Sequence, residues 1–124
     1  PIAGLSIRGC FHYDRGYVYF RNVGNRLLLG GGRNLDFAGE QTATFGHTDP
    51  IQAYLTQLLR DTILPQHNFE IDQWWSGIMG VGGQKKPIIT RHGASTVVAV
   101  RLGGMGVALG THAGEQAAKL LKEN

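Results

Sequence analysis

The feature that most constrains this chain is its last quarter, where an apolar run, a glycine-rich turn and a helical segment follow one another. The apolar run covers residues 97–102, the turn covers residues 103–106, and the helical pattern continues to about residue 121. β-Branched residues favour a strand, and closely spaced glycines allow the backbone to turn sharply. The sequence therefore predicts a strand, a glycine turn and a helix, with the helix amino-terminus directed back over the end of the strand.

The beginning of this last helix is expected to attract a negatively charged group. No Ser, Thr, Asp or Asn precedes it as a cap, so several backbone N–H groups need another partner. Such an end suits a phosphate or any group that gathers negative charge. Gly104, Gly106 and Gly110 give a loose version of the dinucleotide-binding fingerprint, but no second strand follows before Asn124. We therefore expect the strand and helix to join a sheet from elsewhere; the alternative is a purely structural corner.

Two further elements follow from local patterns in the first half of the chain. Residues 17–21 and 26–30 have the composition of strands, and the Asn-Val-Gly-Asn sequence at 22–25 predicts a hairpin turn between them. A helix is predicted over about residues 50–64, with Asp49 as its N-cap, Pro50 in its first turn and Pro65 at its end. Apolar residues recur along it at helical spacing, so we expect it to cover a core.

The remaining segments give weaker signals for extended structure. We expect a first strand within residues 1–12, a strand at 69–79 from its alternation, and a short strand at 87–90. The last helix is predicted over about 106–121. The predicted fold class is α+β, with antiparallel strands, one amphipathic covering helix and a C-terminal strand–glycine turn–helix.

Composition excludes several classes of function. The 124 residues carry a formal charge of +3, but Lys and Arg are scattered and form no nucleic-acid-binding stripe. No apolar run reaches the length of a membrane span. A lone Cys10 and the absence of a leader pattern favour a cytoplasmic location. The five histidines are widely separated and no nucleophile motif is present, so we assign neither a metal site nor a catalytic residue.

Six segments together resemble a known family. They are the strand at 17–21, the glycines after residue 29, the helix ending at Pro65, and the segments 75–79, 86–89 and 103–107. In this order they are similar to the C-terminal part of FAD-dependent oxidoreductases of the D-amino acid oxidase and glycine oxidase type. The resemblance implies that residues 1–95 are the distal part of a substrate domain and residues 96–124 the terminal strand and helix of an FAD-binding domain. It also implies a missing N-terminal FAD-binding portion as a partner.

The same resemblance implies a cofactor site at the glycine turn. The FAD-binding residues would be Gly103, Gly104, Met105, Gly106 and Val107, beside the pyrimidine edge of the flavin ring. That edge becomes negative when the flavin takes a hydride, and a helix amino-terminus favours this change.

The substrate side shows one departure from the family pattern. Tyr17 matches a family tyrosine that faces substrate; alternatively, it only fills the face of a sheet. Met79 stands where the family usually offers an arginine to the substrate carboxylate, and Gly104 stands where glycine oxidases have a basic residue. Arg101 and Arg21 are candidate substitutes, and we expect Tyr17, Met79 and Arg101 to contact an amine or amino-acid substrate.

Three functional hypotheses follow. The first is part of an FAD-dependent oxidoreductase, whose isolated 124-residue chain would be inactive. The second is a stand-alone module that binds a nucleotide or phosphate at the glycine turn. The third is an inert fragment that self-associates through exposed apolar surface. We also expect the isolated chain to form a homo-oligomer if it is part of an oxidoreductase.

Overall fold

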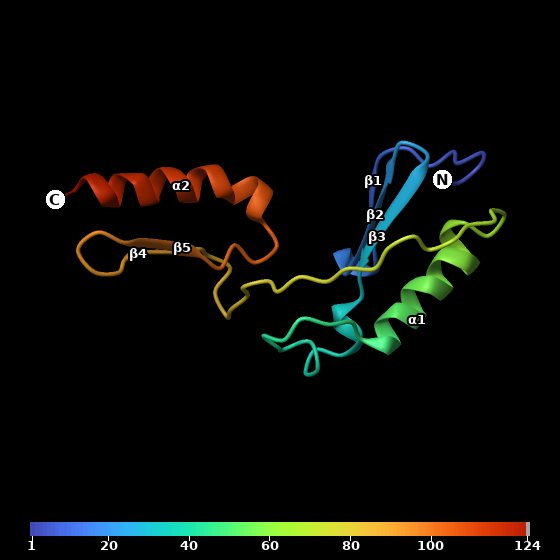
Figure 1. Cartoon of the computed structure of the whole chain (residues 1–124), viewed down its shortest axis with the longest axis horizontal. Coiled ribbons are helices and arrows are strands. Elements are labelled where there is room, and N and C mark those ends of the chain that lie inside the picture. Colours follow the sequence, from blue (N-terminus) through green and yellow to red (C-terminus); the bar gives the residue numbers. More distant parts are fainter. Residues whose placement is uncertain (124) are drawn as a thin grey trace. The chain divides into compact units, whose positions relative to one another are not determined.

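The computed structural model describes residues 1–123 and divides into two compact units, of which the first is Pro1–Ser76 and the second begins at Gly77 (Figure 1). Each unit contains a small antiparallel sheet and one main helix. This confirms the predicted α+β class. None of the helices described for these residues is long and apolar enough to cross a membrane.

The first unit is built on a three-stranded meander. Strands β1 (Cys10–Tyr13), β2 (Val18–Val23) and β3 (Arg26–Gly31) pair antiparallel in the order β1-β2-β3. Val23 pairs with Arg26, so Gly24 and Asn25 form the two-residue turn of the predicted hairpin. Gly24 has a φ of 60°, which a glycine adopts at little steric expense. The first strand lies at the end of the predicted range, since residues 1–9 form no ladder.

The predicted covering helix is also confirmed. Helix α1 (Asp49–Leu58) continues into a π-helical turn, η3 (Leu59–Ile63). Its apolar face packs on Val18 of β2, which is fully buried, and the buried members of this cluster on the helix are Ile51, Leu55 and Leu58. These residues recur with the 3.6-residue period of a helix, so they lie on one face of α1. Their burial against the sheet forms the core between α1 and β2.

The start of α1 differs by one position from the prediction. Thr48, not Asp49, occupies the extended cap position, and Asp49 lies in the first turn. The Thr48 hydroxyl does not cap the helix because it donates instead to a carboxylate oxygen of Glu40 at 2.6 Å. Asp49 still places a negative charge near the positive end of the helix dipole.

The second unit is a hairpin covered by the last helix. Strands β4 (Ile88–Arg91) and β5 (Val97–Val100) pair antiparallel, and α2 (Gly106–Lys122) packs on both. Ala113 is the buried contact of α2, and the Arg91 guanidinium donates to the carbonyl of Leu120 near the helix end. The predicted last helix is therefore confirmed, as is the short strand near residues 87–90.

One strand prediction was wrong, and a second was wrong in extent. Residues 69–79 form no strand: Phe69 packs on a small cluster around Leu64, whereas Trp75 is largely exposed, and the segment has no ladder partner in either sheet. Alternating side chains need a hydrogen-bonding neighbour to become a strand, and this stretch runs from one compact unit to the other. The strand predicted over 97–102 ends at Val100, because Arg101 takes a left-handed φ of 62°.

Gly110 and Gly114 of α2 lie in open space. A Cβ added to Gly110 or Gly114 would meet no heavy atom within 4 Å. The packing of this unit therefore leaves room for a side chain at both positions.

Candidate functional site

The glycine turn between β5 and α2 is the first feature of the candidate site. Gly103 and Gly104 have φ angles of 58° and 84°, so both backbones lie in the left-handed region. The N-cap position is Met105, whose side chain makes no capping hydrogen bond, as the sequence predicted. The first helical hydrogen bond runs from Leu109 N–H to the Met105 carbonyl at 2.8 Å. The N–H groups of residues 106–108 consequently have no partner in the preceding turn.

The side chains around this helix end are apolar and open to solvent. Val107 is fully exposed and Met105 is 55% exposed. A Cβ on Gly103 would meet no atom within 4 Å, so that part of the turn is bare backbone. The site thus presents apolar surface and free backbone donors side by side.

The segment after residue 78 lies directly against the turn. The Gly103 N–H donates to the carbonyl oxygen of Gly80 at 3.1 Å. A Cβ on Gly104 would meet the sulfur of Met79 at 3.1 Å, which is closer than ordinary van der Waals contact. The structure therefore brings together Met79 and the turn, two features that the sequence placed 24 residues apart.

Arg101, which lies just before the turn, forms hydrogen bonds with the loop that contains Lys86. Its Nε and Nη2 atoms both donate to the carbonyl oxygen of Lys86, at 3.0 and 2.9 Å. Gly80 and Gly82 leave room for this residue: a Cβ would lie 3.3 Å from the Arg101 Cα at the first position and 3.0 Å from its Cδ at the second. The edge of the guanidinium formed by Nε and Nη2 is thus occupied by a backbone carbonyl, and its remaining donors are the two N–H groups of Nη1 and the second N–H of Nη2.

Tyr17 lies in the first unit, whereas Met79, Arg101 and the glycine turn lie in the second. Its carbonyl accepts a hydrogen bond from Gly32 N–H at 2.9 Å. A Cβ on Gly31 would lie 1.9 Å from the same oxygen, so this close approach requires glycine. Tyr17 is therefore held against the end of β3 by backbone contacts.

The sequence did not single out the side chains that contact the Tyr17 ring. The ring of Phe37 meets it edge to face, with centroids 5.7 Å apart. The guanidinium carbon of Arg33 lies 5.8 Å from the Tyr17 centroid and 5.6 Å from the Phe37 centroid. The only signal for this cluster was the glycine run before residue 33, which indicates a close approach but not its partner.

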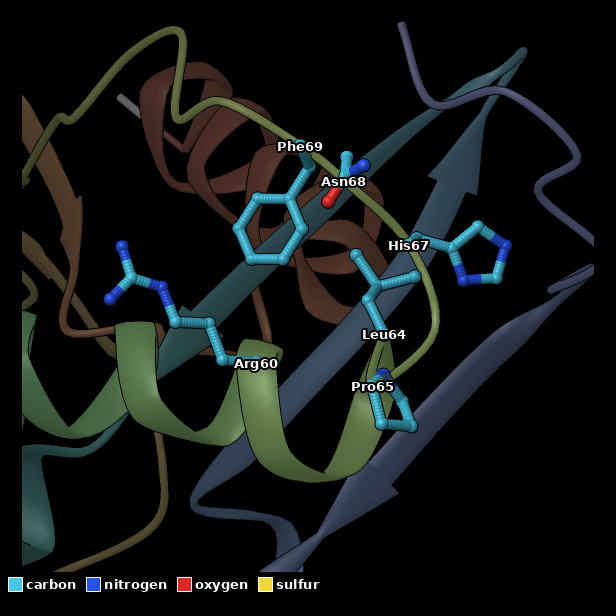
Figure 2. A pocket seen from close by; sticks show the side chains of 6 residues that line it. All are labelled: Arg60, Leu64, Pro65, His67, Asn68 and Phe69. Carbon is cyan, nitrogen blue, oxygen red and sulfur yellow. The ribbon is translucent and has the colours of Figure 1, made fainter.

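A separate hollow of about 260 Å³ lies where η3 ends (Figure 2). Its lining residues are Arg60, Leu64, Pro65, His67, Asn68 and Phe69. Figure 2 shows the Arg60 and His67 side chains directed to different sides, so their polar groups do not converge on one point. This hollow therefore lacks the convergent polar groups of a ligand site. Among residues 1–123, no group of three or more His, Cys, Asp or Glu side chains is placed to hold a metal ion.

Comparison with known proteins identifies the family to which the sequence conforms. The model of the family described as DAO, FAD dependent oxidoreductase, matches residues 2–120. Searches among curated proteins and among solved structures gave no match.

Proposed function

Since this chain belongs to the DAO family of FAD-dependent oxidoreductases, we propose that it is the C-terminal portion of a flavoprotein that oxidises an amine or an amino acid. The match spans nearly the whole chain, which favours this hypothesis over a stand-alone nucleotide-binding module or an inert fragment. When bound, FAD would supply the redox chemistry by accepting a hydride from the substrate carbon that bears nitrogen.

The observation that supports this proposal best is the open helix end after the glycine turn. Gly103 and Gly104 present bare backbone, Met105 and Val107 present apolar side chains, and the N–H groups of residues 106–108 lack helical partners. A flavin ring has a flat apolar body and a polar pyrimidine edge, so these groups fit it. Gly103, Gly104, Met105, Gly106 and Val107 would hold that edge, and the helix dipole would favour negative charge on it.

On the substrate side, we propose contacts from Tyr17, Met79 and Arg101. Met79 lies beside Gly104, so a substrate at the turn would meet its thioether. Lys86 takes two of the five N–H donors of the Arg101 guanidinium, so Arg101 would reach a substrate through the N–H groups that remain on Nη1 and Nη2. Met79 offers no N–H donor to a carboxylate, so of these two residues only Arg101 would pair with one.

The adenosine and pyrophosphate of FAD would be held by a segment outside these 124 residues. The sequence contains no Gly-x-Gly-x-x-Gly turn, which in this fold class binds the pyrophosphate. We therefore propose that the isolated chain retains no FAD, has no oxidase activity and self-associates through its exposed apolar residues. A yellow preparation with a flavin spectrum would contradict the first part, and a monomer by light scattering would contradict the last.

The test of the proposed activity uses the full-length protein loaded with FAD. It is mixed without oxygen with amines and amino acids, and the flavin absorbance near 450 nm is followed. We expect bleaching with at least one substrate of these two classes, and recovery of colour on admitting an acceptor. Stable FAD binding without bleaching by any member of the panel would contradict the proposed substrate class.

A further inference from the structure

We propose that strand β1 pairs with β1 of a second copy of this chain and joins the two three-stranded sheets into one. The pairing is antiparallel about a two-fold axis, and the two copies of Phe11 lie opposite each other at that axis. This inference rests on the self-association proposed above and deepens it, because it names the strand, the register and the contacts.

Strand β1 is the open edge of the first sheet. The order β1-β2-β3 gives it a neighbour on one side only, and all four of its residues are exposed. The opposite edge, β3, is mostly half-buried and contacts α1. Natural sheets block free edges with Lys, Pro or inward-pointing charges, and β1 contains none of these. It is therefore the edge that a further strand can join.

The contacts between β2 and β3 show which way the backbone groups of β2 point. Gly32 N–H donates to the Tyr17 carbonyl at 2.9 Å, so this carbonyl is directed toward β3. Val23 pairs with Arg26 beside a two-residue turn, a position that hairpins close with hydrogen bonds. Because backbone groups alternate sides along a strand, odd-numbered residues of β2 face β3 and even-numbered residues face β1.

The register of β1 with β2 carries this alternation to the outer edge. Phe11 and Tyr13 pair with even-numbered residues of β2, so their backbone groups point inward. The backbone groups of Cys10 and His12 point outward. Among residues 1–123, no backbone hydrogen bond outside the helices and ladders involves either residue. Each copy thus offers two N–H and two C=O groups to a further strand.

A two-fold pairing centred on Phe11 uses all of these groups. Cys10 of one copy lies opposite His12 of the other, and each of the two such pairs exchanges two hydrogen bonds. A shift of one residue would set His12 opposite Phe11 of the second copy, whose backbone groups point inward. The alternation therefore excludes that shift.

The side chains at the centre of the pairing fit this register. Phe11 is 40% exposed and stacks on Phe20 of its own sheet, with ring centroids 4.9 Å apart and planes 8° apart. Residues that face each other without exchanging hydrogen bonds have the closest side chains in an antiparallel pair. The two copies of Phe11 would therefore touch and join the stacked rings of both sheets into one row, which aromatic cross-strand contacts stabilise.

Charge selects this register over those shifted by two residues. Counting outward from Phe11 places Arg8 of one copy opposite Asp14 of the other, twice in the dimer. Both residues are exposed, and among residues 1–123 neither takes part in an ion pair. Asp14 accepts a hydrogen bond from Asn34 on one carboxylate oxygen, which leaves the other oxygen for Arg8. A shift of two residues in either direction breaks both charge pairs, so a second copy in the stated register complements the edge best.

Disulfide crosslinking of the 124-residue chain tests the register. In His12→Cys, the new thiol lies opposite Cys10 of the second copy, at a Cα separation that a disulfide can span. We expect mild oxidation to give a covalent dimer and nothing larger, because both cysteines of each chain are then used. Tyr13→Cys is the matched control, since it is exposed on the same strand but directs its side chain to the other face. We expect at least tenfold less covalent dimer from it, and equal crosslinking of the two variants would overturn the proposal.

Sedimentation equilibrium tests the pairing without an added thiol. His12→Pro removes an outward N–H that no bond within the chain uses, so we expect a folded monomer unit and a dimer Kd at least tenfold higher. His12→Ala keeps that N–H and should leave the Kd within twofold. Arg8→Glu leaves the strand backbone unchanged and sets like charges opposite each other, so it should raise the Kd at least threefold even where His12→Pro unfolds the chain.

The outcomes separate this inference from the proposals on which it rests. A wild-type dimer that neither His12→Pro nor Arg8→Glu weakens would overturn the pairing through β1 and leave self-association to another surface. A wild-type chain that stays monomeric would overturn both the pairing and the self-association. Neither result bears on the oxidation of amines or amino acids, which the flavin bleaching experiment tests in the full-length protein.

Discussion

The backbone N–H of Gly103 donates to the carbonyl oxygen of Gly80 at 3.1 Å, and this bond helps to join the two segments of the candidate site. On one side of the bond lies the glycine turn, and on the other lies the segment that begins at Met79. The Met79 sulfur consequently sits against Gly104. A site assembled in this way depends on backbone conformation more than on side-chain chemistry.

The first prediction concerns the loop that Arg101 fastens. Arg101→Met removes two hydrogen bonds to the Lys86 carbonyl, and we expect a loss of about 1 kcal/mol in stability. The Gly103 amide, which is bonded to Gly80, should then exchange its hydrogen faster. The His92 amide, bonded to the Thr96 carbonyl at 2.7 Å in the same unit, serves as the internal control. Unchanged exchange at Gly103 would show that Arg101 does not hold the loop.

The second prediction concerns the close approach at the end of β3. In Gly31→Ala the new Cβ would lie 1.9 Å from the Tyr17 carbonyl oxygen, at a φ of 113°. We expect a loss of more than about 3 kcal/mol, because backbone must move on both sides of the contact. Gly24→Ala is the matched control: it has a φ of 60° in open space and should lose about 1 kcal/mol. Equal effects of the two changes in chemical unfolding would refute the steric account.

The third prediction concerns alkaline pH. Burial, and next the charges of Tyr13 and Asp14, raise the pKa of the Tyr54 hydroxyl above its usual value. The folded state therefore favours the neutral hydroxyl of Tyr54. This preference contributes fully to the free energy of unfolding below about pH 10, the pKa of tyrosine in an unfolded chain. This contribution is lost as pH rises through the higher folded pKa. Tyr54→Phe should accordingly lose less thermal stability than wild type between pH 9 and 11. Parallel melting curves of the two proteins over this range would contradict the assignment.

Local chemistry explains which parts of the fold were predictable from the sequence. The hairpin was encoded by a two-residue turn, and α1 by apolar spacing between two prolines. The strand predicted for residues 69–79 was wrong because alternation describes only the side chains. A strand also needs a hydrogen-bonding partner strand, which no local sequence pattern supplies. The predicted end of β5 was wrong for another reason. An arginine rarely takes the left-handed φ seen at Arg101, so the sequence gives no sign that the strand stops there.

The candidate site was predictable only in part for similar reasons. The glycine turn and the uncapped helix are sequence-local features, and the structure shows both. The contact between Met79 and Gly104 and the fork of Arg101 on Lys86 join residues 15 or more positions apart. Gly80 and Gly82 lie close to Arg101, and only the structure reveals this packing. For the cluster of Arg33 on Tyr17 and Phe37, the glycine run before residue 33 likewise did not identify which side chains meet.

The most direct test of the account is the affinity of the full-length protein for FAD in two matched variants. Gly104→Ala and Gly93→Ala both place a side chain at a left-handed φ, 84° and 81°, so each should lose about 1–2 kcal/mol of stability. Gly93 faces open space in the β4–β5 turn, whereas Gly104 lies at the proposed flavin edge against Met79. We predict that Gly104→Ala raises the Kd for FAD at least tenfold while Gly93→Ala leaves it within twofold. An unchanged Kd in a folded Gly104→Ala protein would contradict the proposal that the flavin binds at this turn.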